Sequence, residues 1–226
     1  MKPIRHLRGC LVVSVQAWAG SALDDPQVIG ALARAAAENG AAALRIDGPR
    51  NIEAVRKRTA APIIGIYKRK YLGFEPYITP TPLEVNALAA AGASIIAFDA
   101  TARARPGGAS AAQLIDAIHQ HGLLAMADCA TIEDARAALL AGAEIVATTL
   151  CGYTPQTQGR ALPALDLVQA MRLLEGFVIC EGGIDTPAAA AAAFAAGADA
   201  IVVGTAITNV DALVRRFVAV TPSAQQ

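Results

Sequence analysis

The sequence predicts one α/β domain folded as a (β/α)8 barrel, the TIM-barrel architecture. A glycine followed by an apolar run recurs at Gly40, Gly92, Gly142 and Gly197, so the close copies lie 50 to 55 residues apart. Each interval holds one further strand candidate, which gives about eight units of roughly 28 residues. The strand candidates are apolar without alternation, as expected for parallel strands covered on both faces. An open doubly wound sheet is the alternative, but the first strand lacks the glycine fingerprint of a dinucleotide site.

Length, composition and charge limit the remaining classes. The chain has 226 residues, 54% of them hydrophobic, and we expect a single domain over residues 1–226. Within it, residues 1–8 are interpreted as a basic N-terminal leader and residues 221–226 as a frayed polar tail. The formal net charge is zero, which argues against a nucleic-acid partner. No apolar run reaches membrane-spanning length, so no membrane association is expected.

The cysteines indicate a reducing compartment. Cys10, Cys129, Cys151 and Cys180 stand singly, which favours a reduced cytoplasmic protein over a disulfide framework. The last three follow or end strands, an arrangement that would also suit a thiolate metal site. Small buried side chains explain them better, and we expect no metal.

Strands and helices are expected to alternate along the whole chain. The expected strands span Leu11–Val15, Ala42–Ile46, Ile63–Tyr67, Ile95–Phe98, Leu123–Ala127, Ile145–Thr148, Val178–Cys180 and Ala200–Val203. The helices after them begin at capping or first-turn proline signals, as at Thr81-Pro82 and Thr186-Pro187, and several end at glycine. They span Pro26–Asn39, Asn51–Arg58, Pro82–Ala91, Ala111–His121, Ile132–Ala141, Ala164–Leu174, Pro187–Ala196 and Val210–Val218.

Glycines follow the last two strands directly. Gly182 and Gly183 come after the strand ending near Cys180, and Gly204 and Thr205 come after Val203. Glycine at such a position lets backbone N–H groups approach an anion, and the last two turns of many barrels hold a phosphate in this way. We therefore expect a barrel of the phosphate-binding type, although tight turns alone would also use these glycines.

Polar residues stand at the carboxyl ends of the strands, the end where barrel active sites lie. Taken singly, Gln16 or Asp99 has a simpler explanation as a partner of loop backbone, and Arg45 as an ion-pair partner of Asp47 or Glu181. Lys68 has the alternative of being one more exposed base. Together they indicate a small-molecule site with one lysine and several carboxylates, formed by Gln16, Arg45, Lys68, Asp99, Asp128, Thr148, Thr149, Glu181, Gly204 and Thr205.

At these positions the chain resembles the N-acylmannosamine-6-phosphate 2-epimerase family of bacterial sialic acid breakdown. The matching segments run in order over nearly the whole chain. They are Ser14–Ala17, Leu44–Gly48, Ile63–Tyr71, Tyr77–Thr81, Ala97–Thr101, Met126–Asp128, Thr148–Thr154, Glu181–Ile184 and Val203–Thr208.

The resemblance implies interconversion of N-acetylmannosamine 6-phosphate and N-acetylglucosamine 6-phosphate without a metal or organic cofactor. It assigns the catalytic lysine to Lys68 and its partner glutamate to Glu181. Substrate contacts are implied at Gln16, Arg45, Asp128, Tyr153 and Thr154, and phosphate contacts at Gly182, Gly183, Gly204 and Thr205.

Three positions depart from the family pattern. Lys70 stands where the family often has aspartate, and Cys180 replaces a usual alanine. Asn209 stands where many members have an arginine, which puts a side-chain contribution to phosphate binding in doubt.

The residues suit the implied chemistry, which removes a proton next to a carbonyl and returns it on the opposite face. A lysine of ordinary pKa is almost fully protonated at pH 7, so desolvation in the barrel must lower the pKa of Lys68 for it to act as a base. Glu181 would then orient Lys68 or relay a proton, and Asp128 would assist ring opening or hold a hydroxyl. One base serving both faces and two opposed bases both remain open.

Two other functions compete with the epimerase. One is another phosphosugar lyase or isomerase, such as an aldolase that uses Lys68 as a Schiff base. The other is a phosphometabolite-binding regulatory barrel without turnover. In each case the partner is a small phosphosugar or related metabolite, and a homodimer is open among the oligomeric states.

Overall fold

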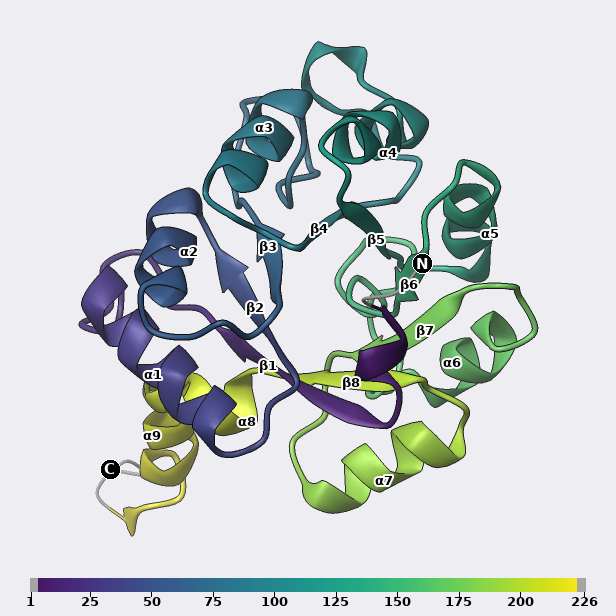
Figure 1. The fold of residues 1–226 in the computed structure, drawn as a ribbon. Coiled ribbons are helices and arrows are strands. Elements are labelled where there is room, and N and C mark those ends of the chain that lie inside the picture. The colour runs from purple at the N-terminus through teal and green to yellow at the C-terminus, as the bar shows by residue number, and fades with distance from the viewer. Residues whose placement is uncertain (1–3, 223–226) are drawn as a thin grey trace.

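The computed structural model describes residues 4–222, and eight parallel strands close into a barrel in the order of the chain (Figure 1). Each strand pairs with the next, and β8 pairs with β1, Cys10 lying opposite Ala200. The predicted (β/α)8 barrel is confirmed. The strands are β1 Cys10–Val15, β2 Ala43–Asp47, β3 Ile63–Ile66, β4 Ile95–Asp99, β5 Leu124–Asp128, β6 Ile145–Ala147, β7 Phe177–Glu181 and β8 Ala200–Val203.

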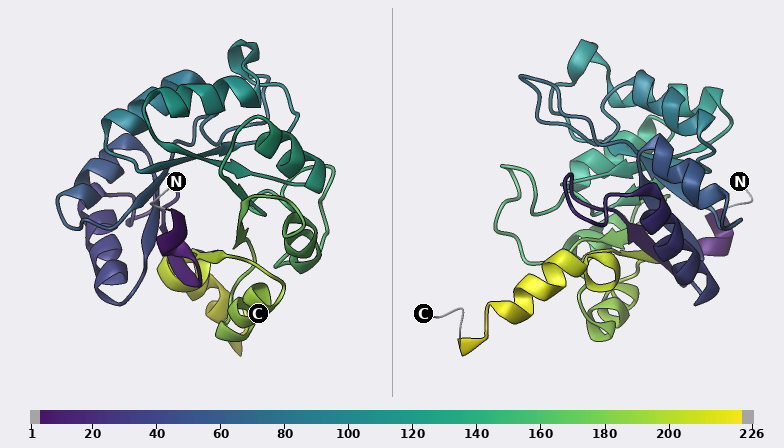
Figure 2. Two further views of the ribbon diagram at one scale, coloured as in Figure 1. Left: turned by 45° about the vertical axis from the view of Figure 1, so that its right-hand side comes forward. Right: turned by 90° about the vertical axis from the view of Figure 1, so that its left-hand side faces the viewer.

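Helices form an outer ring around the strands (Figures 1 and 2). Several begin at the expected capping signals. The Thr81 hydroxyl caps α3 while Glu84 reaches back to the Thr81 backbone, so orphan N–H groups are satisfied from both sides. The helices are α1 Pro26–Glu38, α2 Pro49–Arg56, α3 Pro82–Ala90, α4 Ala111–Gln120, α5 Ile132–Leu140, α6 Leu165–Met171, α7 Pro187–Ala195, α8 Thr205–Thr208 and α9 Val210–Val218, with 3-10 turns η1 Ile4–Leu7 and η2 Pro106–Gly108.

The barrel interior is filled by every second residue of the strands. Small and branched side chains such as Val12, Ala43, Ile64 and Met126 form this inner cluster, while the alternate residues pack outward against the helices. Polar side chains that continue the inward series past the strand ends therefore meet above an apolar floor.

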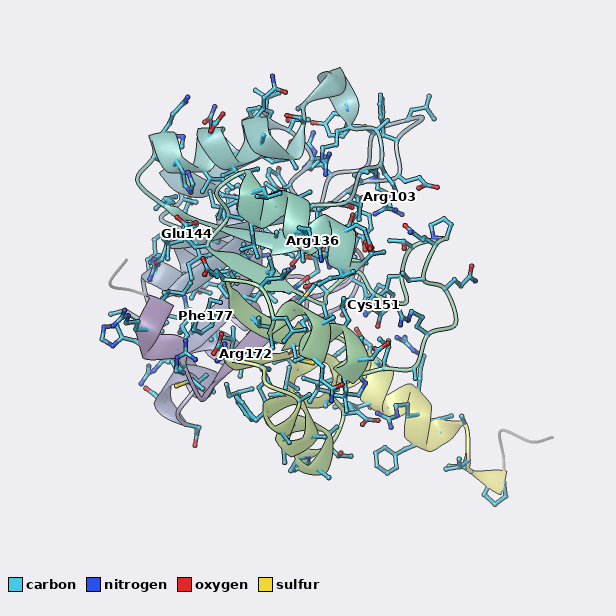
Figure 3. The ribbon with its side chains drawn as sticks, turned by 90° about the vertical axis from the view of Figure 1, so that its right-hand side faces the viewer. Arg103, Arg136, Glu144, Cys151, Arg172 and Phe177 are labelled. Atoms are coloured by element: carbon cyan, nitrogen blue, oxygen red, sulfur yellow. The ribbon has the colours of Figure 1, made fainter. Side chains whose placement is uncertain are left out.

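The predicted N-terminal leader contributes to this floor. Within it, η1 places Leu7 in the inner cluster, where its side chain is buried. Arg8 stacks over the ring of Phe177, at the start of β7, with 5.7 Å from guanidinium to ring centroid. Figure 3 shows Phe177 beside η1, with Cys151 and Arg103 toward the opposite end of the barrel. The segment packs because Leu7 is apolar within an otherwise basic stretch.

The chain after β8 differs from a simple strand–helix repeat. The short helix α8, absent from the predicted elements, follows the strand, and α9 then projects away from the barrel (Figure 2, right). None of the α9 residues is buried. Of the predicted tail, residues 223–226 lie outside the described residues. No helix within residues 4–222 is long and apolar enough to cross a membrane.

Candidate active site

Most of the polar strand ends meet in one pocket of about 480 Å3 at the carboxyl end of the barrel, although Asp99, Asp128 and Thr148 do not line it. Arg45, Lys68 and Glu181 each stand two positions after a residue of the inner cluster, so strand alternation turns them inward. The wall is completed by loops after several strands. Among the lining residues are Ser14, Gln16, Trp18, Arg45, Lys68, Tyr77, Thr149, Tyr153, Glu181, Gly182, Gly183, Gly204 and Thr205.

Arg45 anchors the pocket floor through two carboxylates. Its Nη1 and Nη2 donate to Asp128 Oδ1 at 3.1 Å and Oδ2 at 2.6 Å, a bidentate pair. Nη1 also lies 3.0 Å from Glu181 Oε2. The Thr149 hydroxyl bridges the two acids, 2.8 Å from Asp128 Oδ1 and 3.0 Å from Glu181 Oε2. Because the Arg45 and Asp128 side chains are 1% and 0% exposed, water cannot replace either partner.

Glu181 is largely buried, and it shares one guanidinium with Asp128. Burial is the main cause that raises the pKa of Glu181, to about 7, and the Asp128 charge adds to it. Arg45, the Thr149 hydroxyl and Lys68 oppose the shift. Near neutral pH, Glu181 can therefore hold or release a proton, as a general acid or base must.

Lys68 follows β3 and is exposed toward the open pocket. Protein atoms around the mouth still displace water from its ammonium group, and this desolvation lowers the pKa of Lys68. Asp47 opposes that change, and Arg45 adds to it. The backbone N–H of Lys68 donates to Asp47 Oδ1 at 3.0 Å. Asp47 therefore holds the backbone of Lys68 in place and also brings a negative charge close to it.

The turns after β7 and β8 both face the pocket, as the glycine pattern indicated. Gly183 has φ +71°, and an added Cβ would lie 2.4 Å from Cβ of Leu162, so both conformation and space demand glycine. Gly182 has φ +105°, with the Tyr153 ring 3.7 Å from where its Cβ would be. Gly204 is followed by Thr205, the first residue of α8.

The structure separates the predicted substrate contacts into two groups. Gln16 and Tyr153 line the pocket, and the Gln16 amide donates to the Ser14 hydroxyl at 2.6 Å. Asp128 and Thr154 do not line it. Both Asp128 oxygens are bonded beneath Arg45, and the Thr154 hydroxyl bonds that of Thr157 at 2.8 Å within the loop after β6. Asp128 and Thr154 therefore support the pocket through other side chains, and their contact with a substrate stays a prediction.

The three departures from the family pattern occupy different environments. Cys180 points to the outer layer, where burial raises the pKa of its thiol to about 11. Lys70 is exposed on the loop after β3 and does not line the main pocket. Asn209 does line it, but its side chain accepts the Ala212 N–H at 3.0 Å and caps α9. Only the change at Asn209 reaches the site.

The predicted site omitted Asp47 and Trp18. Asp47 was considered as a partner of Arg45, whereas its carboxylate accepts from the backbone of Lys68. Two-residue periodicity from Arg45 could have identified Asp47. Trp18 lies in the loop after β1 and carries no such signal. Among residues 4–222, no three His, Cys, Asp or Glu side chains form a group that could hold a metal ion.

Glu181→Gln tests the pKa of the buried acid through stability. The folded pKa lies above the ordinary value of 4.5, so this carboxyl stabilises the fold fully below pH 4.5 and loses that contribution as pH rises to about 7. A neutral glutamine has no such loss. Urea unfolding should therefore show the stability of Glu181→Gln, relative to the unmodified protein, rising between pH 5 and pH 8. A difference that stays constant with pH would contradict the raised pKa.

Comparison with known proteins shows relatives that match more than nine-tenths of the chain. Residues 29–223 match the family described as "Putative N-acetylmannosamine-6-phosphate epimerase". A "Putative N-acetylmannosamine-6-phosphate 2-epimerase" of Synechococcus elongatus is 48% identical, covering 95% of this chain and 94% of that relative. A protein of the same name from Klebsiella pneumoniae is 47% identical, covering 92% of this chain and 87% of that relative.

A solved structure agrees with this relationship. The N-acetylmannosamine-6-phosphate 2-epimerase from Clostridium perfringens superimposes with a TM-score of 0.94 at 39% identity, covering 98% of this chain and 97% of that one. Sequence, fold and pocket thus lead to one assignment: the chain belongs to the N-acetylmannosamine-6-phosphate epimerase family.

Proposed function

We propose that this protein is an epimerase that interconverts N-acetylmannosamine 6-phosphate and N-acetylglucosamine 6-phosphate, in amino sugar and sialic acid catabolism. The observation that carries the proposal is the desolvated Lys68 in one pocket with the Arg45–Glu181 pair and the glycine turns after β7 and β8. Family membership supplies the substrate pair, and the pocket supplies groups able to carry out the chemistry.

The reaction exchanges a proton at C2 of the open-chain sugar. Neutral Lys68 takes the C2 proton, the C–H electron pair forms a C1=C2 double bond, and the carbonyl oxygen at C1 becomes an oxyanion. Arg45 supplies fixed positive charge to the same pocket, where developing anionic charge is stabilised without reorganisation. Proton return to the opposite face of C2 gives the epimer, and electrons and atoms balance without a cofactor. Lys68 serves both faces if the intermediate turns, and Glu181 serves the second if it does not.

The direct test is incubation of the pure protein with N-acetylmannosamine 6-phosphate in deuterated water, followed by NMR. The expected product is N-acetylglucosamine 6-phosphate with one deuterium at C2 and none elsewhere. Glu181→Gln should lower the rate by about 10²–10⁴-fold, the usual contribution of a positioned acid or base. Absence of both conversion and C2 exchange in the unmodified protein would refute the proposal.

Phosphate recognition is the second expectation, because two glycine turns and Thr205 border the pocket together. Unphosphorylated N-acetylmannosamine should lose several kcal/mol of transition-state binding, or on the order of 10³-fold in kcat/KM. The measurement is the ratio of kcat/KM for the two sugars under identical conditions. Comparable values would place recognition elsewhere on the sugar.

We further propose a cytoplasmic homodimer. The single cysteines and the phosphosugar substrate favour the cytoplasm. The dimer is supported by α9, where Val210, Val214, Phe217 and Val218 are 48% to 75% exposed at helical spacing. A second copy of the chain would bury this face.

Phe217→Glu tests this interface, because a charge at its most exposed aromatic residue would have to be desolvated in a dimer. Light scattering after gel filtration should give a dimer for the unmodified protein and a monomer for the variant. Arg215→Ala on the same helix is the matched control and should remain dimeric. If the unmodified protein elutes as a monomer, the proposal of a homodimer is refuted.

A further inference from the structure

The backbone that carries Lys68 is held by the segment returning from the long loop after β3. Lys68 and Ile78 form an isolated antiparallel bridge. On either side of it, the Arg69 N–H donates to the Tyr77 carbonyl at 2.9 Å, and the Thr79 N–H donates to the Tyr67 carbonyl at 3.0 Å. The position of the Lys68 Cα therefore depends on the returning strand rather than on β3 alone.

Thr79 is the unusual residue of that returning segment. Its φ is +46°, and among residues 4–222 it is the one non-glycine residue with positive φ. A β-branched residue disfavours this conformation, and the following residue, Pro80, restricts it further. The side chain is completely buried. Strained backbone of this kind persists only where the surrounding contacts determine it, and it concentrates at functional sites.

The Thr79 hydroxyl connects β4 to the residue that precedes the lysine. It donates to the Ala97 carbonyl of β4 at 2.7 Å and accepts the Tyr67 N–H at 3.2 Å. The next N–H along the chain, that of Lys68, donates to Asp47 of β2 at 3.0 Å. Two successive N–H groups are thus bound to side chains, that of Tyr67 to Thr79 of the returning loop and that of Lys68 to Asp47 of β2.

We propose that Thr79 is a positioning residue for the reaction: its left-handed backbone and its buried hydroxyl hold Lys68 at the height and direction required to reach C2 of the sugar. The inference rests on the proposed function, in which Lys68 is the base. Proton transfer to a lysine demands close placement, and displacement of a reacting group by about 1 Å can cost on the order of 10²-fold in rate. A purely structural role would instead affect stability and leave the rate constant of the folded enzyme unchanged.

Three variants separate the hydroxyl from the backbone strain. Thr79→Val keeps the shape and removes the hydroxyl. Thr79→Gly also lacks the hydroxyl but accepts positive φ, so it folds even if the valine variant does not. Thr79→Ser keeps the hydroxyl. We expect kcat to fall on the order of 10²-fold in the first two, with KM within about threefold, and to return to within about threefold of the unmodified enzyme in Thr79→Ser.

Thr131→Val is the matched control. Thr131 is also a buried threonine with a bonded hydroxyl, but it caps α5 and does not line the pocket. The Thr131→Val variant should have a lower free energy of unfolding and an unchanged kcat. Trp18, the sole tryptophan of the chain, lines the pocket, so its fluorescence reports binding of N-acetylglucosamine 6-phosphate independently of turnover. Unchanged binding with reduced kcat, and a pH profile of kcat displaced from that of the unmodified enzyme, supports the inference.

The outcomes distinguish this inference from the proposed function. If the unmodified enzyme interconverts the sugars and folded Thr79→Gly retains its kcat and pH profile, the positioning role is overturned alone. If the unmodified protein neither converts the sugar nor responds in fluorescence, the proposed function falls and the inference falls with it. Equal loss of kcat in Thr131→Val would also overturn it, because any buried threonine would then have the same effect.

Discussion

Lys68→Ala is expected to remove nearly all epimerisation and solvent exchange at C2, with a loss of about 10⁴-fold in kcat. Removal of a positioned base costs up to that factor, and here no second lysine lines the pocket within residues 4–222. The fold should survive, since Lys68 is exposed to the pocket and its backbone N–H, not its side chain, holds Asp47. NMR in deuterated water measures conversion and exchange together, and thermal unfolding checks the fold.

The same variant separates the competing reactions of the pocket. Borohydride in the presence of substrate should form no reducible adduct with the unmodified enzyme, because an epimerase needs no Schiff base on Lys68. An adduct that disappears in Lys68→Ala would instead identify an aldolase-type reaction. Exchange at C2 that continues at the original rate in Lys68→Ala would transfer the role of base to another group, and Glu181 lines the same pocket.

Arg45→Met should lower the free energy of unfolding by about 3–5 kcal/mol, the cost of leaving a buried charge without its partner. Asp128, which is 0% exposed, would keep only the Thr149 hydroxyl among its bonded side chains. Activity should also disappear, because the pocket loses its fixed positive charge. Urea unfolding at pH 7 and the C2 exchange assay measure the two effects.

The double variant Arg45→Met/Asp128→Leu separates the loss of stability from the loss of activity. Replacement of a buried ion pair by apolar side chains of similar size is often neutral or stabilising, so most of the lost stability should return. Activity should not return. A single variant as stable as the unmodified protein would contradict the importance of the Arg45–Asp128 pair, and so would a double variant no more stable than the single.

The barrel could be predicted closely because its signals are local and repeated. Apolar runs and glycine-terminated helices place each strand within about a residue of its observed bounds, and Ala200–Val203 agrees completely. β3 stops at Ile66 instead of Tyr67, because Tyr67 pairs with the returning loop. Helix α8 was not predicted, since four residues carry no periodicity, and Leu7 was grouped with a leader whose composition is basic.

The inward-facing groups could also be predicted, because strand ends in a parallel barrel converge. Arg45, Lys68 and Glu181 lie together in one pocket, although their catalytic roles remain predictions. How deeply each strand-end side chain is buried could not be predicted. The sequence does not reveal that Asp128 lies beneath Arg45 with both carboxylate oxygens bonded. Nor does it reveal the backbone of Thr79, because a threonine in the left-handed region has no sequence signal and depends on contacts distant in the chain.

The opposite placement of η1 and the pocket has a practical consequence for handling this protein. η1 sits at the amino ends of the strands, whereas the long loops and α9 extend at the other side (Figure 2). Immobilisation through exposed groups near η1, such as Arg5 and His6, would leave the mouth open to bulk solution. Attachment through α9 would instead bring a support next to that mouth and restrict diffusion of reactants. For a biosensor or a flow reactor, the amino end is therefore the better point of coupling.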